Sequence, residues 1–489
     1  MTPDSTTRFL DALDRHPKLT LVIMAAVLCA IRSIGILNEG FWWDEASTAN
    51  LAMLGPEAII DWSAENQNPP LYFLLVSGWS AVLGVSEIGL RSFSLLLSVA
   101  TGLVLYRLAH RHVGRESALL AFLLYAGSGI GLYYAQEARS YTLTTLLCTF
   151  SFLLYLDLFR QPRTSRAILL GLTNLAAAFV HFTSIPVLLV QPLVAGLFFR
   201  RRTKSLRLYF ISQFVAASAF LPWVGNLARN TPVAGEYWLS PPDIEAVVDV
   251  VLTLAGGPIP ASLSGALLLG AAALAARGRL TGVVTRETAW TLALWWLLPI
   301  GFAAVVSQWF PIFSPRYLLA TTLAFFLVQA ALLSALPISP LFRLLIAGTI
   351  ACAGLFAPQP VKYVKPDWRN AAVHIESARG PRTAIAVTPG GRCLPLAWYL
   401  LPEEFAQIRP LGMQSLRAEG VFCLSGEEDI AALARTDAAR LVLVVGRGDF
   451  RSPETVVAAL PGREWHLRNR QDLEGVVILQ YDGRAVRFP

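Results

Sequence analysis

Eleven long apolar segments constrain this chain more than any other feature of its sequence. A helix needs about 20 predominantly apolar residues to cross the hydrocarbon core of a bilayer. The segments lie near 19–37, 91–109, 117–135, 141–158, 167–181, 184–199, 207–226, 261–276, 289–306, 317–335 and 343–358. Of the 489 residues, only 15% are charged, against about 25% in an average soluble protein. We therefore predict an α-helical polytopic membrane protein with about 11 transmembrane helices.

The charged residues are concentrated at the C-terminal end. Residues 362–489 hold 17 Lys and Arg and 15 Asp and Glu, or 32 of the 73 charges in the chain. Short β-rich runs at 383–388, 440–445 and 475–481 alternate with helical patterns such as 427–435. This alternation predicts a small α/β layer structure. We expect residues 1–361 to form the transmembrane domain and residues 362–489 a water-soluble α/β domain.

The distribution of basic residues predicts the orientation in the membrane. Segment 69–84 is apolar but short and begins with two prolines, so we interpret it as a partly buried amphipathic helix in the interface. If this segment does not span the membrane, 18 of the 23 Lys and Arg residues of the membrane part lie on the side of the N-terminus. The positive-inside rule then places the N-terminus in the cytoplasm and the C-terminal domain outside. The net charge of +7 is dispersed along the chain, which argues against a nucleic-acid partner.

Several kinds of site are disfavoured by the motifs that the sequence lacks. It contains no CxxC, no HExxH, no Walker A loop and no Rossmann fingerprint, which argues against structural zinc and ATP-driven transport. The external domain carries Cys393 and Cys423. A disulfide between them is one alternative in an oxidising compartment, and two free thiols are the other.

The first outer loop places two adjacent carboxylates beyond the first apolar segment. Asp44 and Glu45 directly follow Trp42 and Trp43. One reading is an aromatic belt with solvated acids. The other is catalytic, because apolar surroundings disfavour the charged form of a carboxylate and raise its basicity, as a general base for a hydroxyl requires. Glu45 would orient Asp44 or help it to hold a divalent metal ion, the single cofactor that these residues suggest.

Two further outer loops combine arginines with tyrosines. The second loop contains Tyr134, Glu137, Arg139 and Tyr141, and ionisable residues at membrane depth are costly and usually functional. A later turn contains Arg316, against the positive-inside trend. An arginine fork matches two phosphate oxygens, so a lipid phosphate is the expected partner. The alternatives are a Glu–Arg surface pair in the second loop and a snorkelling arginine at position 316.

Neighbouring residues extend the candidate site. Tyr317 follows Arg316, and Asn68 begins the NPPLY segment, which either shapes a groove or ends a loop. His181 lies in an HFTSIP turn, where a structural hydrogen-bonded histidine is the favoured interpretation.

These motifs resemble a known family. The outer-loop WWDE, NPPLYF, YYAQEARSYT, SPRYLL and PDWRNAA segments are similar to those of GT-C superfamily membrane glycosyltransferases. That superfamily includes protein O-mannosyltransferases, the lipid A aminoarabinose transferase and lipopolysaccharide-core galacturonosyltransferases. The resemblance covers residues 19–375 and implies a GT-C fold and a polyprenyl-phosphate-linked sugar donor. It implies that Asp44 is the catalytic base and that Glu45 and Glu137 assist.

The resemblance also implies that Arg139 and Arg316 bind the donor phosphate. The aminoarabinose transferase uses a lysine near its interfacial helix, but no lysine occurs here between Lys18 and Lys204, so the arginines would serve instead.

We therefore expect an inverting glycosyltransferase in the cytoplasmic membrane that acts on its outer face. It would transfer a sugar from a polyprenyl-phosphate donor to an envelope acceptor, which is lipopolysaccharide, another glycan or lipid, or a protein. One alternative is a transporter or flippase of a lipid-linked sugar, and another is a binding or scaffold subunit. Neither alternative requires a carboxylate pair beside the outer boundary.

Overall fold

The computed structural model describes residues 5–66, 68–229, 239–277, 284–356, 365–446, 452–460 and 463–485. The chain forms two compact units, each assembled from three segments. The first unit comprises Met1–Ile34, Ile59–Leu75 and Arg91–Val361, and the second comprises Gly35–Ala58, Val76–Leu90 and Lys362–Pro489. The second unit thus contains much of the first outer loop together with the C-terminal region. The domain boundary that we predicted at 361/362 lies outside the described residues.

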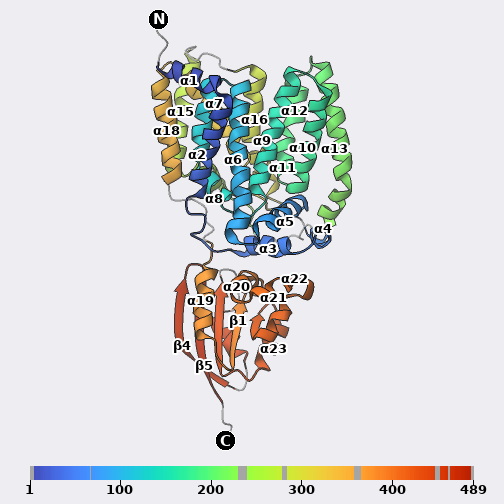
Figure 1. The fold of residues 1–489 in the computed structure, drawn as a ribbon, viewed down its shortest axis with the longest axis vertical. Coiled ribbons are helices and arrows are strands. Elements are labelled where there is room, and N and C mark those ends of the chain that lie inside the picture. The colour runs from blue at the N-terminus through green and yellow to red at the C-terminus, as the bar shows by residue number, and fades with distance from the viewer. Residues whose placement is uncertain are drawn as a thin grey trace. The chain divides into compact units, whose positions relative to one another are not determined.

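The first unit is a helical bundle, and a helix or a pair of helices occupies each of the predicted apolar segments (Figure 1). In chain order these are α2 (Pro17–Ser33), α6 (Glu87–His112), α7 (Arg115–Ala126) with α8 (Gly129–Ala135), α9 (Tyr141–Arg160), α10 (Thr164–Val180), α11 (Ser184–Leu188) with α12 (Val190–Phe198), α13 (Thr203–Arg229), α15 (Pro258–Ala276), α16 (Arg286–Val306), α17 (Thr321–Ala335) and α18 (Pro340–Phe356). The predicted mostly helical, polytopic fold is confirmed.

Length and composition separate these helices into two groups. Among the described residues, five helices are long and apolar enough to cross a membrane, or up to seven if each of two bent pairs is one span. The bent pairs are α1 (Ser5–Arg15) with α2, and α7 with α8. The other apolar helices are 10 to 17 residues long. The chain is a multi-pass membrane protein.

The break between α7 and α8 is stabilised by a buried arginine. Arg32 of α2 is fully buried and donates hydrogen bonds to the carbonyl oxygens of Tyr125 (2.7 Å), Ala126 (3.2 Å) and Ser128 (3.4 Å). These carbonyls lie at the break between the two helices, where the regular backbone hydrogen bonding of α7 ends. The side chain of Gln136, beyond α8, donates to the carbonyl oxygen of Arg32 at 3.0 Å. Together these bonds position the second outer loop against the end of α2.

The first outer loop forms three short helices. They are α3 (Trp43–Met53), α4 (Pro56–Glu65) and α5 (Leu71–Leu83). The longest, α5, has 13 residues and is about 20 Å long, which is less than the hydrocarbon thickness of about 30 Å. Its length agrees with our interpretation of segment 69–84 as non-spanning. However, α5 exposes apolar side chains such as Val82 and Leu83, so the polar face that we expected is missing.

A five-stranded mixed sheet lies in the second unit (Figure 1). Its strands are β1 (Thr383–Thr388), β2 (Val421–Cys423), β3 (Arg440–Gly446), β4 (Arg463–Leu473) and β5 (Val476–Ala485), in the order β2-β1-β3-β5-β4. Strands β1, β2 and β3 are parallel, with Ile385 paired to both Val421 and Val442, whereas β4 and β5 are antiparallel additions. The predicted α/β layer structure is confirmed.

Burial explains this strand order. Residues 384–388 of β1 are all buried, as expected for a parallel strand covered on both faces. Its core partners include Leu443 of β3 and Leu433 of α23 (Glu427–Ala434). In contrast, β4 is a charged edge strand, and charged side chains protect an edge from pairing with other chains. Helix α19 (Trp368–Ala378) precedes β1, whereas α20 (Cys393–Leu400) and α24 (Pro453–Ala458) lie between strands.

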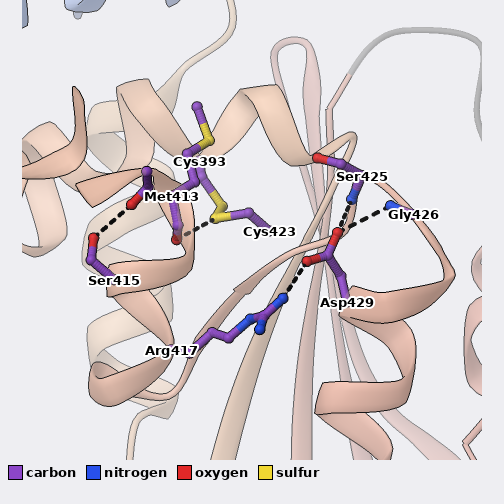
Figure 2. Close-up of a disulfide and its surroundings, with 9 residues drawn as sticks. Cys393, Met413, Ser415, Arg417, Cys423, Ser425, Gly426 and Asp429 are labelled. Atoms are coloured by element: carbon purple, nitrogen blue, oxygen red, sulfur yellow. Dashed lines mark hydrogen bonds and ion pairs between the residues drawn. A yellow bond between two sulfur atoms is a disulfide. The ribbon is translucent and has the colours of Figure 1, made fainter. Parts of the chain in front are cut away.

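A disulfide joins Cys393 and Cys423, at the start of α20 and the end of β2 (Figure 2). The structure therefore selects the disulfide from the two alternatives that the sequence left open. Asp429 lies nearby and accepts hydrogen bonds from the Ser425 backbone (2.8 Å) and the Arg417 guanidinium (2.7 Å). Burial alone would raise the pKa of Asp429, but these bonds outweigh it and lower that pKa. The carboxylate therefore stays ionised at neutral pH.

The disulfide predicts a specific pattern of thiol reactivity. We expect alkylation of the denatured, non-reduced protein to modify three cysteines, Cys29, Cys148 and Cys352, and alkylation after reduction to modify all five. The Cys393→Ser variant releases Cys423 and should give four modified cysteines without reduction. Intact-mass spectrometry measures the count. Five modified cysteines in the non-reduced wild type would contradict the disulfide.

Candidate functional site

The second outer loop brings buried charges and aromatic rings together in the first unit. It connects α8 to α9, and Glu137 and Arg139 are 1% and 8% exposed. The guanidinium carbon of Arg139 lies 5.9 Å from the ring centroid of Tyr141, in the first turn of α9. The ring of Tyr134 packs edge-on against Tyr141 at 5.3 Å. The loop is thus a buried polar site rather than a solvated surface pair.

Arg316 reaches the same tyrosine from a distant part of the chain. It lies in the 3-10 turn η1 (Pro315–Tyr317), and its Nη1 donates to the hydroxyl of Tyr141 at 3.5 Å. Its guanidinium carbon is 5.4 Å from the ring centroid of Tyr317, and the rings of Tyr141 and Tyr317 are 6.4 Å apart. The two arginines therefore converge on Tyr141, although 177 positions separate them in the sequence.

His181 completes this group. Its ring centroid lies 5.9 Å from that of Tyr141 and 5.4 Å from that of Tyr317. Its Nδ1 accepts a hydrogen bond from the backbone N–H of Thr183. The hydroxyl of Thr183 lies 2.9 Å from the same Nδ1. Local hydrogen bonds and ring contacts thus hold the buried His181, in line with the structural role that we expected.

We call Tyr134, Glu137, Arg139, Tyr141, His181, Arg316 and Tyr317 the arginine–tyrosine cluster. Tyr134 and Tyr141 also belong to a buried core with Leu254 of α14 (Ile244–Leu254) and Leu318. Apolar packing therefore surrounds the polar groups. Asn68, half-buried before α5, makes no hydrogen bond or ion pair with the cluster among the described residues.

The acidic pair of the first outer loop lies in the second unit. Asp44 and Glu45 occupy the first turn of α3 and are 9% and 0% exposed. Carboxylates at a helix N-terminus are stabilised by the helix dipole and by its unpaired N–H groups. Such burial excludes the interpretation of Asp44 and Glu45 as solvated acids.

A buried lysine neutralises Glu45. The Nζ of Lys365 lies 3.3 Å from Oε2 of Glu45 and 3.6 Å from Oε2 of Glu39, and its side chain is only 4% exposed. Our sequence reasoning missed Lys365, because it lies 320 positions from Glu45. Lys365 directly precedes the PDWRNAA segment, and its position there was the available signal. Our sequence reasoning considered only the helix that begins in this segment.

Asp44 faces a second cation of the same unit. Arg392 lies in the turn that follows the carboxyl end of β1 and is half-buried. Burial lowers the pKa of Arg392, and the opposite charge of Asp44 counteracts this effect. In parallel α/β sheets, ligands commonly bind at the carboxyl ends of the strands. Arg392 is a second residue of the site that the sequence did not reveal.

Residues of the PDWRNAA segment anchor the loop that carries these acids. Arg369 donates to the carbonyl oxygens of Leu37 (3.1 Å) and Glu39 (3.2 Å) and forms an ion pair with Glu87. The hydroxyl of Tyr399 donates to the same Glu87 and accepts from the backbone N–H of Phe41. Burial raises the pKa of Tyr399, and its bond to Glu87 raises it further. The acidic pair thus depends on C-terminal residues for its position.

A divalent metal between Asp44 and Glu45 does not fit this arrangement. A metal of that kind requires several oxygen ligands, and no group of three His, Cys, Asp or Glu side chains suited to a metal occurs among the described residues. The ammonium of Lys365 already pairs with Glu45, and the guanidinium of Arg392 is close enough to Asp44 to interact with it electrostatically. Two fixed cations would repel a metal ion, so we derive no step through one.

Comparisons with known proteins agree with the predicted resemblance. Residues 67–225 match the model of the dolichyl-phosphate-mannose-protein mannosyltransferase family. Two uncharacterised proteins of Aquifex aeolicus (strain VF5) are 30% identical over 190 residues and 32% identical over 149 residues. These matches cover 37% and 30% of this chain, and 37% and 33% of the relatives, so the chain spans about a third of the length of each.

The fold is similar to a solved crystal structure, that of ArnT from Cupriavidus metallidurans. The apo structure has a TM-score of 0.58 at 12% identity and covers 95% of this chain and 98% of ArnT. The structure bound to undecaprenyl phosphate has a TM-score of 0.60 at 13% identity, with 94% and 97% covered. The chain therefore shares the fold of ArnT, in agreement with the predicted resemblance to GT-C membrane glycosyltransferases, and has a small C-terminal sheet domain.

The Lys365–Glu45 pair predicts a non-additive effect on stability. Removal of one partner of a buried ion pair leaves an uncompensated charge and costs about 3 to 5 kcal/mol. We expect Lys365→Met and Glu45→Gln each to lower the melting temperature of the full-length protein strongly, and the double variant to recover much of the loss. Differential scanning fluorimetry in detergent measures this cycle.

An exposed pair provides the control for this cycle. Arg470→Gln removes the surface pair with Asp472 and should leave the melting temperature unchanged. Additive losses in the Lys365 and Glu45 cycle would show that the two side chains do not interact.

Proposed function

We propose that this chain is an inverting glycosyltransferase that uses a polyprenyl-phosphate-linked sugar. The observation that carries the proposal is the convergence of Arg139 and Arg316 on Tyr141 in a chain with the fold of ArnT. The ArnT structure with undecaprenyl phosphate supports a lipid phosphate as the ligand. The acceptor in our proposal is a component of the cell envelope: lipopolysaccharide, another glycan or lipid, or a protein.

The arginine–tyrosine cluster supplies the positive charge that such a reaction needs. When the sugar leaves its carrier, negative charge develops on the departing phosphate. Arg139 and Arg316 would hold that phosphate through charge-assisted hydrogen bonds. Donors held in place in apolar surroundings stabilise a developing charge more strongly than water does. Tyr134, Tyr141 and Tyr317 keep the guanidinium groups in place, and Asn68 would bind the donor near α5.

Asp44 is the proposed general base. Its carboxylate would accept the proton of the acceptor hydroxyl while the hydroxyl oxygen attacks the anomeric carbon of the sugar. The new glycosidic bond forms as the bond from that carbon to the phosphate oxygen breaks, and the electron pair remains on polyprenyl phosphate. One displacement inverts the anomeric configuration. The guanidinium of Arg392 interacts electrostatically with Asp44 and would help to hold this carboxylate in position.

The other acids have supporting roles in this proposal. Glu45 is held by Lys365, so it would orient α3 and Asp44 rather than take a proton itself. Glu137 precedes Arg139 in a buried turn, in which the N–H of Arg139 donates to the carbonyl oxygen of Glu137 at 2.8 Å. We propose that Glu137 fixes the orientation of that arginine.

We also propose that the C-terminal domain lies outside the cytoplasmic membrane, with the N-terminus in the cytoplasm. The positive-inside count of the sequence supports this orientation. The Cys393–Cys423 disulfide supports it independently, because disulfides form and persist in oxidising compartments.

The base assignment predicts a rate loss without a loss of folding. General-base catalysis contributes about 10²- to 10⁴-fold, so we expect Asp44→Asn to reduce sugar transfer by at least 100-fold. The assay measures release of polyprenyl phosphate from a panel of polyprenyl-phosphate sugars, with a delipidated envelope extract as acceptor. Asp61→Asn, in the same outer loop, is the matched control and should retain full activity.

Two results would contradict this proposal. Full activity of Asp44→Asn would remove the base from the mechanism. Movement of the lipid-linked sugar across proteoliposomes by the wild type, without release of polyprenyl phosphate from any donor, would favour the transporter alternative.

The phosphate assignment predicts a loss of donor affinity. A hydrogen bond to a charged group contributes about 1.5 to 3 kcal/mol, which corresponds to about 10- to 150-fold in binding. We expect Arg316→Gln to weaken binding of polyprenyl phosphate by that factor, and Arg316→Lys to weaken it less because the charge remains. Isothermal titration calorimetry measures the affinity. Arg229→Gln, on a predicted outer segment, is the control, and equal loss there would contradict a specific role of Arg316.

A further inference from the structure

A basic pocket opens at the other end of the helical bundle. Its volume is about 310 Å³, and it is lined by the end of α6, the end of α9, the start of α16 and the residues around Phe199. Three arginines contribute to its wall: Arg111, Arg160 and Arg202. All of these elements belong to the first unit.

This pocket is remote from the arginine–tyrosine cluster. Helix α9 carries Tyr141 of the cluster at one end and Arg160 of the pocket at the other. Its 20 residues correspond to about 30 Å at 1.5 Å per residue. The two sites therefore lie about one hydrocarbon thickness apart, and the pocket is not part of the proposed catalytic site.

The pocket carries excess positive charge. Arg111 and His112 share Asp157, and Glu287 is the one carboxylate in the pocket wall among the described residues. Arg160 donates to the carbonyl oxygen of Arg111, and Arg202 donates to that of Phe159. Carbonyl groups orient a guanidinium without cancelling its charge. The wall can therefore accept an anion.

Aromatic rings form the other part of the wall. Phe159 and Phe199 are stacked with their centroids 4.3 Å apart, and the guanidinium carbon of Arg202 lies 5.6 Å from the ring centroid of Phe199. A free inorganic anion gains nothing from contact with such an apolar surface. A ligand that carries a phosphate next to a hydrocarbon group can pair its charge and bury its apolar part in the same pocket.

We propose that this pocket binds the phosphate of an anionic phospholipid headgroup, with the adjacent apolar part of the lipid against Phe159 and Phe199. Basic pockets between transmembrane helices on the cytoplasmic side are typical sites for anionic lipid headgroups. The site is independent of the proposed transferase activity and goes beyond it. It gives a local function to arginines that the positive-inside rule explains only as determinants of orientation.

Native mass spectrometry of the full-length protein in nonionic detergent tests the site. The probes are phosphatidylglycerol, phosphatidylcholine and inorganic phosphate. We expect the wild type to bind one phosphatidylglycerol more tightly than phosphatidylcholine. One basic residue near a membrane surface changes anionic lipid binding by about fivefold, so the R160Q/R202Q double variant should bind phosphatidylglycerol about 30-fold more weakly.

Two further variants test the role of charge and position. R160K/R202K keeps the charge and should bind within a few-fold of the wild type, which separates loss of charge from loss of folding. R201Q removes an exposed arginine that does not line the pocket and should bind like the wild type.

Three results would overturn the proposal. Unchanged binding of phosphatidylglycerol by R160Q/R202Q would show that the pocket does not hold it. An equal loss of phosphatidylglycerol binding in R201Q would show that general surface charge, and not the pocket, causes the effect. Binding of inorganic phosphate with no preference for phosphatidylglycerol over phosphatidylcholine would show that the pocket recognises a soluble anion.

Discussion

The fully buried Arg32 determines much of the geometry of the helical bundle. Backbone carbonyls at a helix end have no intrahelical partner, and a bilayer offers no water to satisfy them. Arg32 donates to the carbonyl oxygens of Tyr125 and Ala126 where α7 stops, and these bonds stabilise the 63° bend into α8. The loop after α8 is in turn bonded to Arg32 through Gln136. Arg32 thus helps to position the loop that carries Arg139 of the arginine–tyrosine cluster.

Ion pairs have the corresponding role in the second unit. The first outer loop and the C-terminal region are far apart in sequence, but Lys365 binds Glu45 and Arg369 binds Glu87. A buried charge is expensive unless it is paired. The carboxylates of the loop are therefore compatible with burial only when the C-terminal residues are in place. This dependence explains why a sheet domain and an outer loop form one compact unit.

The sequence predicted those features that follow from local periodicity. Long apolar runs located the bundle helices, and β-rich runs located β1, β3 and β5, because apolar residues repeat with the period of the element that buries them. Strand β4 was missed because its exposed edge is charged. Lys365 and Arg392 were missed because their partners are more than 300 positions away, and a single sequence does not show which distant residues form a pair. The roles of Asp44, Arg139 and Arg316 remain predictions.

The charge balance around the acidic pair has a consequence for how the site forms. Two cations, Lys365 and Arg392, face the acids Asp44, Glu45 and Glu39. Both cations belong to residues 362–489, so the acids gain their positive partners only when the C-terminal region is folded against them. A metal ion would not depend on that region in this way. Without residues 362–489, Glu45 would be a buried, uncompensated charge, and α3 would not keep its present position. Formation of the acidic site therefore depends on folding of the C-terminal domain, and the small domain is part of the proposed catalytic machinery.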